Sequence, residues 1–83
     1  MEKGLVVYSL AGHDKGNFQV VIRCEGNRVF VCDGKNRTLE KPKSKNIVHL
    51  KATRTVLKNL DLQSNKSIRV FLRQFREKVV NWA

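Results

Sequence analysis

The sequence predicts a small, mainly β domain that is followed by one C-terminal amphipathic helix. Residues 5–10 and 18–25 are short apolar runs rich in β-branched and aromatic side chains, which is typical of strands. From residue 66 onward, apolar residues recur instead at steps of three and four, which is the spacing of one helix face. With 83 residues the chain has room for one domain with a small core.

The segment between the first two expected strands should be a loop with a glycine at each end. Gly12 and Gly16 can take a positive φ without a Cβ clash, which allows a tight turn and leaves backbone that a phosphate can approach. Lys15 supplies a cation beside this backbone. Gly12, Lys15 and Gly16 are therefore candidate binding residues.

Gly26 and Asn27 predict a two-residue hairpin turn. The register that this turn imposes pairs Glu25 with Arg28, Cys24 with Val29, and Ile22 with Val31. Alternate residues would then form one apolar face, which consists of Phe18, Val20, Ile22, Cys24, Val29 and Val31. Cys24 and Cys32 fall on opposite faces of this hairpin, so we expect no disulfide and two reduced cysteines that are core or half-buried residues.

After this hairpin the sequence Asp33-Gly34-Lys35-Asn36 predicts a turn. A short strand over residues 37–40 should follow, with Pro42 after its end, and a last strand is expected over residues 46–50. Lys41, Lys43 and Lys45 alternate along the chain, so in an extended segment they would point the same way. Residues 51–63 read as a connector with one helical turn around residues 56–60.

Ser64 and Asn65 can cap a helix that we expect over residues 66–81. Its apolar stripe consists of Ile68, Phe71, Leu72, Phe75, Val79 and Trp82. Its basic stripe consists of Lys66, Arg69, Arg73 and Arg76. For the apolar stripe we favour packing on the sheet, and the alternative is a homodimer or a partner groove. The spacing of the basic stripe fits phosphate contact and simple solvation equally well. The expected division is thus a β-barrel over residues 1–52 and a connector plus helix over residues 53–83.

The net charge of +10 lies entirely in the second part of the chain. Residues 1–34 hold four basic and four acidic side chains, whereas residues 35–83 hold 13 basic and three acidic ones. A one-sided field of this kind attracts polyanions. Charge alone does not separate RNA from DNA or from anionic lipid.

Several residues in order along the first fifty resemble the KOW motif of ribosomal and transcription-factor RNA-binding domains. They are Gly4, Val6, Gly12, Lys15, Gly16, Val20, Val21, Asp33, Gly34, Lys41, Pro42 and Lys43. The chain looks like the KOW branch that contains the large-subunit ribosomal proteins of the fourteen-e type and small bacterial relatives. Gln19 departs from it, since many KOW loops have a glycine there. The resemblance implies a small SH3-like five-stranded barrel that binds RNA, with ribosomal RNA as the expected partner and ribosomal proteins as possible neighbours.

Other function classes have less support in the sequence. There is no Walker-type loop and no recognisable set of nucleophile, base and orienting residue, so we expect no enzyme and no cofactor. No Cys-x-x-Cys occurs, and His13 and His49 stand at no ligand spacing, so no metal site is expected. No apolar run approaches the roughly 18 residues of a membrane span, and no secretory signal is recognisable, so we expect a cytoplasmic protein without a membrane partner.

The sequence therefore predicts an RNA-binding protein, ribosomal or ribosome-associated, that contacts structured RNA through its phosphates. The candidate RNA-binding residues are Gly12, Lys15, Gly16, Lys35, Arg37, Lys41, Lys43, Lys45, Arg69 and Arg73. Tyr8 and Phe30 could stack on an unpaired base, although core filling is the favoured interpretation for both. The alternative function is a protein interaction module within a transcription or translation complex.

Overall fold

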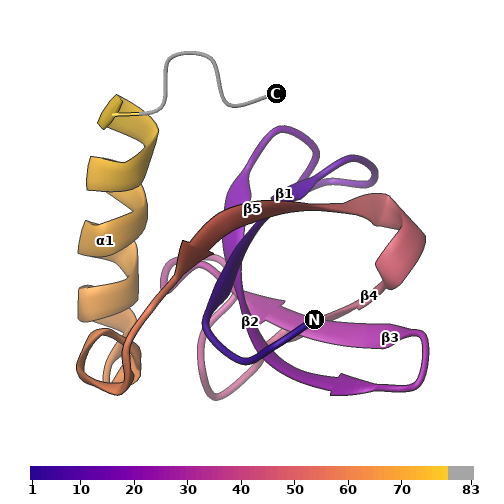
Figure 1. The fold of residues 1–83 in the computed structure, drawn as a ribbon, viewed down its shortest axis with the longest axis horizontal. Coiled ribbons are helices and arrows are strands. Elements are labelled where there is room, and N and C mark those ends of the chain that lie inside the picture. Colours follow the sequence, from indigo (N-terminus) through magenta and orange to yellow (C-terminus); the bar gives the residue numbers. More distant parts are fainter. Residues whose placement is uncertain (79–83) are drawn as a thin grey trace.

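The structure is a computed structural model, and it describes residues 1–78 as one antiparallel sheet followed by a helix (Figure 1). The strands are β1 (Leu5–Ser9), β2 (Phe18–Glu25), β3 (Arg28–Cys32), β4 (Lys43–Asn46) and β5 (Leu50–Val56). Two short 3₁₀ helices, η1 (Ile47–His49) and η2 (Asn59–Leu62), precede and follow β5, and α1 spans Asn65–Lys78. The mainly β fold with a C-terminal helix is confirmed.

The strand order β4-β3-β2-β1-β5 leaves β4 and β5 as the two edges of the sheet. The sheet curves as a barrel does, but it is open, so the expected barrel is barrel-like rather than closed. β5 continues past the expected boundary at residue 52 as far as Val56. The strand therefore joins the two parts into which the sequence had been divided.

The expected hairpin register is correct only next to the turn. Glu25 pairs with Arg28 and Cys24 with Val29, as expected, but Val21 rather than Ile22 pairs with Val31. The register shifts between Val21 and Arg23, so Ile22 is an extra residue in β2, which is the definition of a β-bulge. The single apolar face predicted for this hairpin is consequently wrong.

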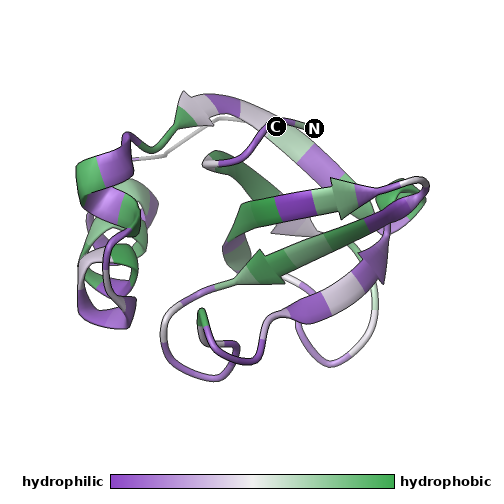
Figure 2. Ribbon diagram, turned by 90° about the horizontal axis from the view of Figure 1, so that it is seen from below, coloured by the Kyte–Doolittle hydropathy of each residue, from purple (hydrophilic) through white to green (hydrophobic). Residues whose placement is uncertain are grey.

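The bulge divides the apolar side chains of the sheet between two buried clusters. One contains Val7, Val21, Val29, Val31 and Leu50 on the inner side of the curved sheet. The other joins the sheet to the helix and contains Val6, Phe18, Val20, Cys32, Leu57, Ile68 and Leu72. Figure 2 shows the corresponding hydrophobic stretches along the strands and on part of the helix.

Two of the expected strands are misplaced. Residues 37–40 form no strand, because side chains and the backbone of the preceding turn, rather than a neighbouring strand, bind their backbone. Asp33 Oδ1 accepts from the backbone nitrogens of Lys35 and Arg37, both at 2.9 Å, and Asn65 Oδ1 accepts from the nitrogen of Leu39 at 2.8 Å. The last strand begins at Leu50, because residues 47–49 form η1 instead, with Asn46 as its N-cap.

The helix packs on the sheet as predicted. Ser64 Oγ accepts from the backbone nitrogen of Ser67 at 3.1 Å, so Ser64 is the cap. Ile68 and Leu72 are buried in the cluster shared with the sheet, and the ring of Phe75 meets that of Phe18 edge to face, with centroids 5.1 Å apart. Val79 and Trp82, the last members of the expected stripe, lie outside the described residues.

Candidate functional site

The loop between β1 and β2 has positive φ angles at its two glycines, as the sequence predicted. Gly12 and Gly16 have φ angles of 80° and 90°. The Gly16 nitrogen donates to the Ser9 carbonyl at 2.9 Å, and the Lys15 nitrogen donates to the Gly12 carbonyl at 3.2 Å. Lys15 itself is exposed at the tip. The loop is thus a closed, hydrogen-bonded turn that presents glycine backbone to the solvent.

A cleft of about 420 Å³ lies beside this loop. We call it the loop cleft, and its lining consists of Ala11, Gly12, His13, Asp14, Arg28, Arg37, Lys43, Ser44, Lys45, Asn46 and His49. Four of these side chains are Lys or Arg and only one is a carboxylate. The lining therefore carries an excess of positive charge together with two imidazoles. Gly12, Arg37, Lys43 and Lys45 were predicted from the sequence as binding residues.

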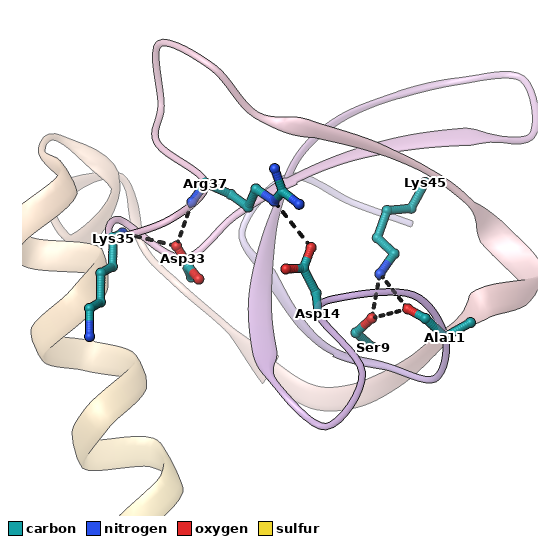
Figure 3. Close-up of polar contacts among 7 residues, drawn as sticks. All are labelled: Ser9, Ala11, Asp14, Asp33, Lys35, Arg37 and Lys45. Atoms are coloured by element: carbon teal, nitrogen blue, oxygen red, sulfur yellow. Dashed lines mark hydrogen bonds and ion pairs between the residues drawn. The ribbon is translucent and has the colours of Figure 1, made fainter.

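An ion pair fixes one cation at the wall of the loop cleft. Arg37 Nε lies 3.2 Å from Asp14 Oδ2, and the Asp14 side chain is almost buried. The Arg37 backbone is held as well, through its bond to Asp33 (Figure 3). Only Nε of the guanidinium is used in this ion pair. Its two terminal nitrogens remain to donate to a ligand.

Lys45 differs from the other lysines near it. It is 8% exposed, and Nζ donates to Ser9 Oγ and, at 3.1 Å, to the Ala11 carbonyl. Figure 3 shows its side chain reaching from β4 to the loop after β1. Burial lowers the pKa of Lys45, the positive charges of Lys43 and Arg37 lower it further, and Asp14 opposes them. Lys43 and Lys45 lie on the same face of β4 and line the same cleft, as their alternation predicts, whereas Lys41 precedes the strand and lines neither cleft. Lys45 differs from Lys43 in being buried.

Arg28, Asn46 and the two histidines line the loop cleft but were not predicted as site residues. Arg28 Nε donates to Ser44 Oγ at 3.1 Å, and a terminal nitrogen lies 3.4 Å from the Ser44 carbonyl. These bonds depend on the pairing of β3 with β4, in which Arg28 lies opposite Asn46. The sequence predicts a strand over residues 37–40 instead, and a strand there gives no reason to expect Arg28 at this cleft.

A second basic cleft, of about 210 Å³, lies where the sheet meets the helix. This helix cleft is lined by Asn17, Phe18, Asp33, Lys35, Asn36, Arg69, Leu72 and Arg76. Arg69 donates to the Gly34 carbonyl at 3.0 Å, which fixes its guanidinium against the turn after β3. Lys35 and Arg69 were predicted site residues, whereas Arg76 had been assigned only to the basic stripe.

The remaining predicted residues, Lys15, Gly16, Lys41 and Arg73, are exposed and line neither cleft. The ten predicted residues are thus divided among two clefts and the open surface. They do not form one continuous row.

The aromatic side chains are engaged within the protein. Tyr8 packs against the cluster shared with the helix, with its ring centroid 5.1 Å from that of Phe18, as the core-filling interpretation predicted. Phe30 is half-buried and is covered by the Arg23 guanidinium, which lies 3.9 Å from the ring centroid. Phe30 therefore belongs to a surface cation–π pair rather than to the core.

The cysteines are both free and differ in environment. Cys32 is buried, and this burial raises the pKa of its thiol to about 12. Cys24 is exposed, which corrects the expectation of a core or half-buried residue. Within residues 1–78, no three His, Cys, Asp or Glu side chains gather as a metal ion would require. None of the described helices is both long and apolar enough to cross a membrane.

Comparison with protein-family models finds no match for the chain, and comparison with curated proteins finds none either. The KOW resemblance accordingly rests on the residues quoted for it.

Proposed function

We propose that this protein is a non-catalytic RNA-binding protein that contacts structured RNA through phosphates. The observation that carries the proposal is the loop cleft, which is lined by four cations and one carboxylate together with Gly12. Phosphate oxygens are well matched by arginine and lysine donors and by exposed glycine backbone. The KOW resemblance supports RNA as the ligand, with a ribosomal or ribosome-associated role in the cytoplasm and ribosomal RNA as the partner.

Three of the four cations of the loop cleft are arranged before any ligand arrives. Arg28 is held by Ser44, Arg37 by Asp14, and Lys45 by Ser9 and Ala11. These bonds use some of the donors on each side chain and leave others available. Because these three side chains are already fixed, binding a phosphate there costs less conformational entropy than it would at a freely moving lysine.

The alternative is a protein interaction module, and one observation favours it. A hollow of about 300 Å³ on the helix is lined by Val70 and Phe71 together with four polar residues, and nearby η2 carries Leu60 at 75% exposure. A partner protein, such as a neighbouring ribosomal protein, could cover these apolar atoms. The packing of Ile68 and Leu72 on the sheet leaves less apolar surface on the helix for a homodimer.

Crosslinking in cells tests the proposal directly. The tagged protein is irradiated in living cells and purified under denaturing conditions, and the RNA bound to it is sequenced. We expect enrichment of ribosomal RNA at base-paired regions, and a variant with Arg28 and Lys43 both changed to alanine should lose most of this signal. Recovery of partner proteins without RNA above background would favour the interaction module instead.

A further inference from the structure

We propose that the loop cleft and the helix cleft bind the two strands of one double-helical RNA segment, with the phosphates of one strand in each cleft. The inference rests on the proposed function and specifies its ligand. It depends on how the two clefts are placed, on how their cations are fixed, and on where the aromatic rings lie.

The two clefts lie on opposite sides of the same pair of loops. Asp14 and Arg37 face the loop cleft, whereas Asn17 and Lys35 face the helix cleft, although these residues come from the same two loops. Figure 3 shows Lys35 beside the helix and Arg37 pointing the other way, toward the loop that carries Asp14. The two loops therefore form a ridge with a cationic cleft on each side. The two strands of a double helix likewise present two rows of phosphates on either side of a groove.

Each cleft contains a cation whose position is set by the fold. In the loop cleft the Arg37–Asp14 ion pair joins the two loops of the ridge, at 3.2 Å. In the helix cleft Arg69 is bound to the Gly34 carbonyl of the same ridge, at 3.0 Å. Both contacts tie their arginine to the ridge itself, so the separation of the two cationic sites is fixed. A fixed separation selects a ligand with a matching spacing of phosphates, which a duplex has and a flexible single strand lacks.

The phenylalanine and tyrosine rings argue against recognition of single strands. Proteins that bind unpaired bases stack them on exposed aromatic rings. Within the described residues, Tyr8, Phe18 and Phe75 pack in the cluster between sheet and helix, and Arg23 covers the ring of Phe30. Phe71 packs against the same cluster. Among the described residues, the rings that line the loop cleft are the imidazoles of His13 and His49, and no Phe or Tyr ring lines it. The one ring that lines the helix cleft, Phe18, is 7% exposed.

Fluorescence anisotropy with labelled RNA tests the inference. The ligands are a duplex of about 20 base pairs, a single strand of equal length without self-pairing, and a DNA duplex of the same sequence. Lys43→Ala removes an exposed cation from the loop cleft, and Arg76→Ala removes one from the helix cleft. Lys58→Ala and Lys78→Ala are the matched controls, because each removes one exposed charge that lines neither cleft.

We expect the RNA duplex to bind at least about tenfold more tightly than the single strand. Lys43→Ala and Arg76→Ala should each weaken duplex binding by about three- to tenfold, as the loss of one phosphate contact does, and the controls by less than about twofold. The effects of Lys43→Ala and Arg76→Ala on single-strand binding should be smaller. Melting curves of all four variants should match that of the parent, which shows that the fold is kept.

Four results would overturn the inference. Equal affinity for the single strand and the RNA duplex would mean that the spacing of the phosphates does not determine binding. An Arg76→Ala variant that binds the duplex like the parent would show that the helix cleft does not contact the RNA. In both cases RNA binding, and hence the proposed function, would stand. Equal or tighter binding of the DNA duplex would replace RNA by DNA as the ligand. Absence of any nucleic-acid binding at low salt would overturn both this inference and the proposed function.

Discussion

Lys45 is a buried cation that connects β4 to the end of β1 through Ser9 and Ala11. Because its pKa is lowered from 10.5 in the folded state, the unfolded chain binds more protons between the lowered value and 10.5. The contribution of Lys45 to stability should therefore increase as pH rises through this window. Urea unfolding of the parent and of Lys45→Met at several pH values from 7 to 10 measures it. A free-energy difference between the two proteins that does not change with pH would contradict this account.

The two cysteines should react very differently. Cys24 is exposed, whereas Cys32 is fully buried with a pKa raised to about 12. Since the thiolate is the reactive form, an alkylating reagent at pH 8 should modify Cys24 and leave Cys32 intact in the folded protein. Mass spectrometry should detect one added group under native conditions and two in denaturant. For Cys24→Ser the native count should be zero, and a modified Cys32 in that folded variant would show that the cluster between sheet and helix is open.

Among the elements, the turn after β3 is the point at which the sheet meets the start of the helix. Gly34 has a φ of 79°, and a Cβ at this position would collide with the Asn65 carbonyl oxygen. Gly12 has nearly the same φ but open space around it. Gly12→Ala should thus cost about 1 to 2 kcal/mol from backbone strain alone. Gly34→Ala should cost about 1 to 3 kcal/mol more, because the helix must shift. If chemical denaturation shows equal losses of unfolding free energy for Gly12→Ala and Gly34→Ala, the helix can shift at this contact without a cost in stability.

The packing of the helix predicts a second loss of stability. Phe75→Ala removes the edge-to-face contact with Phe18 and part of the apolar cover of the sheet, and it should destabilise the fold by about 2 to 4 kcal/mol. Val70→Ala is a control on the same helix, because Val70 lies in the hollow on the helix and outside both core clusters. Truncation after Gln63 should leave Val6, Phe18 and Val20 uncovered and prevent stable folding. A truncated protein that still unfolds cooperatively would show that the helix is dispensable.

The elements that the sequence predicted well are those specified by local pattern. The strands around Val7, Val20 and Val31 and the helix around Ile68 follow from their runs and spacing. The misplaced strands depended on distant side chains, since Asn65 binds the backbone of Leu39 from 26 residues away. The bulge at Ile22 was hidden as well, because an apolar residue fits either face of an alternating pattern.

The same limits apply to the candidate site. The loop with Gly12 and Lys15 was predictable because glycine spacing and charge are local signals. The place of Arg28 in the loop cleft follows from the β3–β4 pairing. The burial of Lys45 accompanies its contacts with Ser9 and Ala11, which are distant in the sequence. Neither is visible from charge alone, which treats all lysines and arginines as equivalent.

For the whole molecule, the central claim is that fixed cations of the two clefts contact RNA phosphates, and salt dependence tests this most directly. The affinity of the parent for an RNA duplex is measured from about 50 to 300 mM salt. Release of counterions by about four to six contacts predicts a log–log slope of about −4 to −5. Lys43→Ala should bring this slope closer to zero by about one unit, while Lys58→Ala leaves it unchanged. A slope near zero for the parent, or the same slope in both variants, would contradict the account.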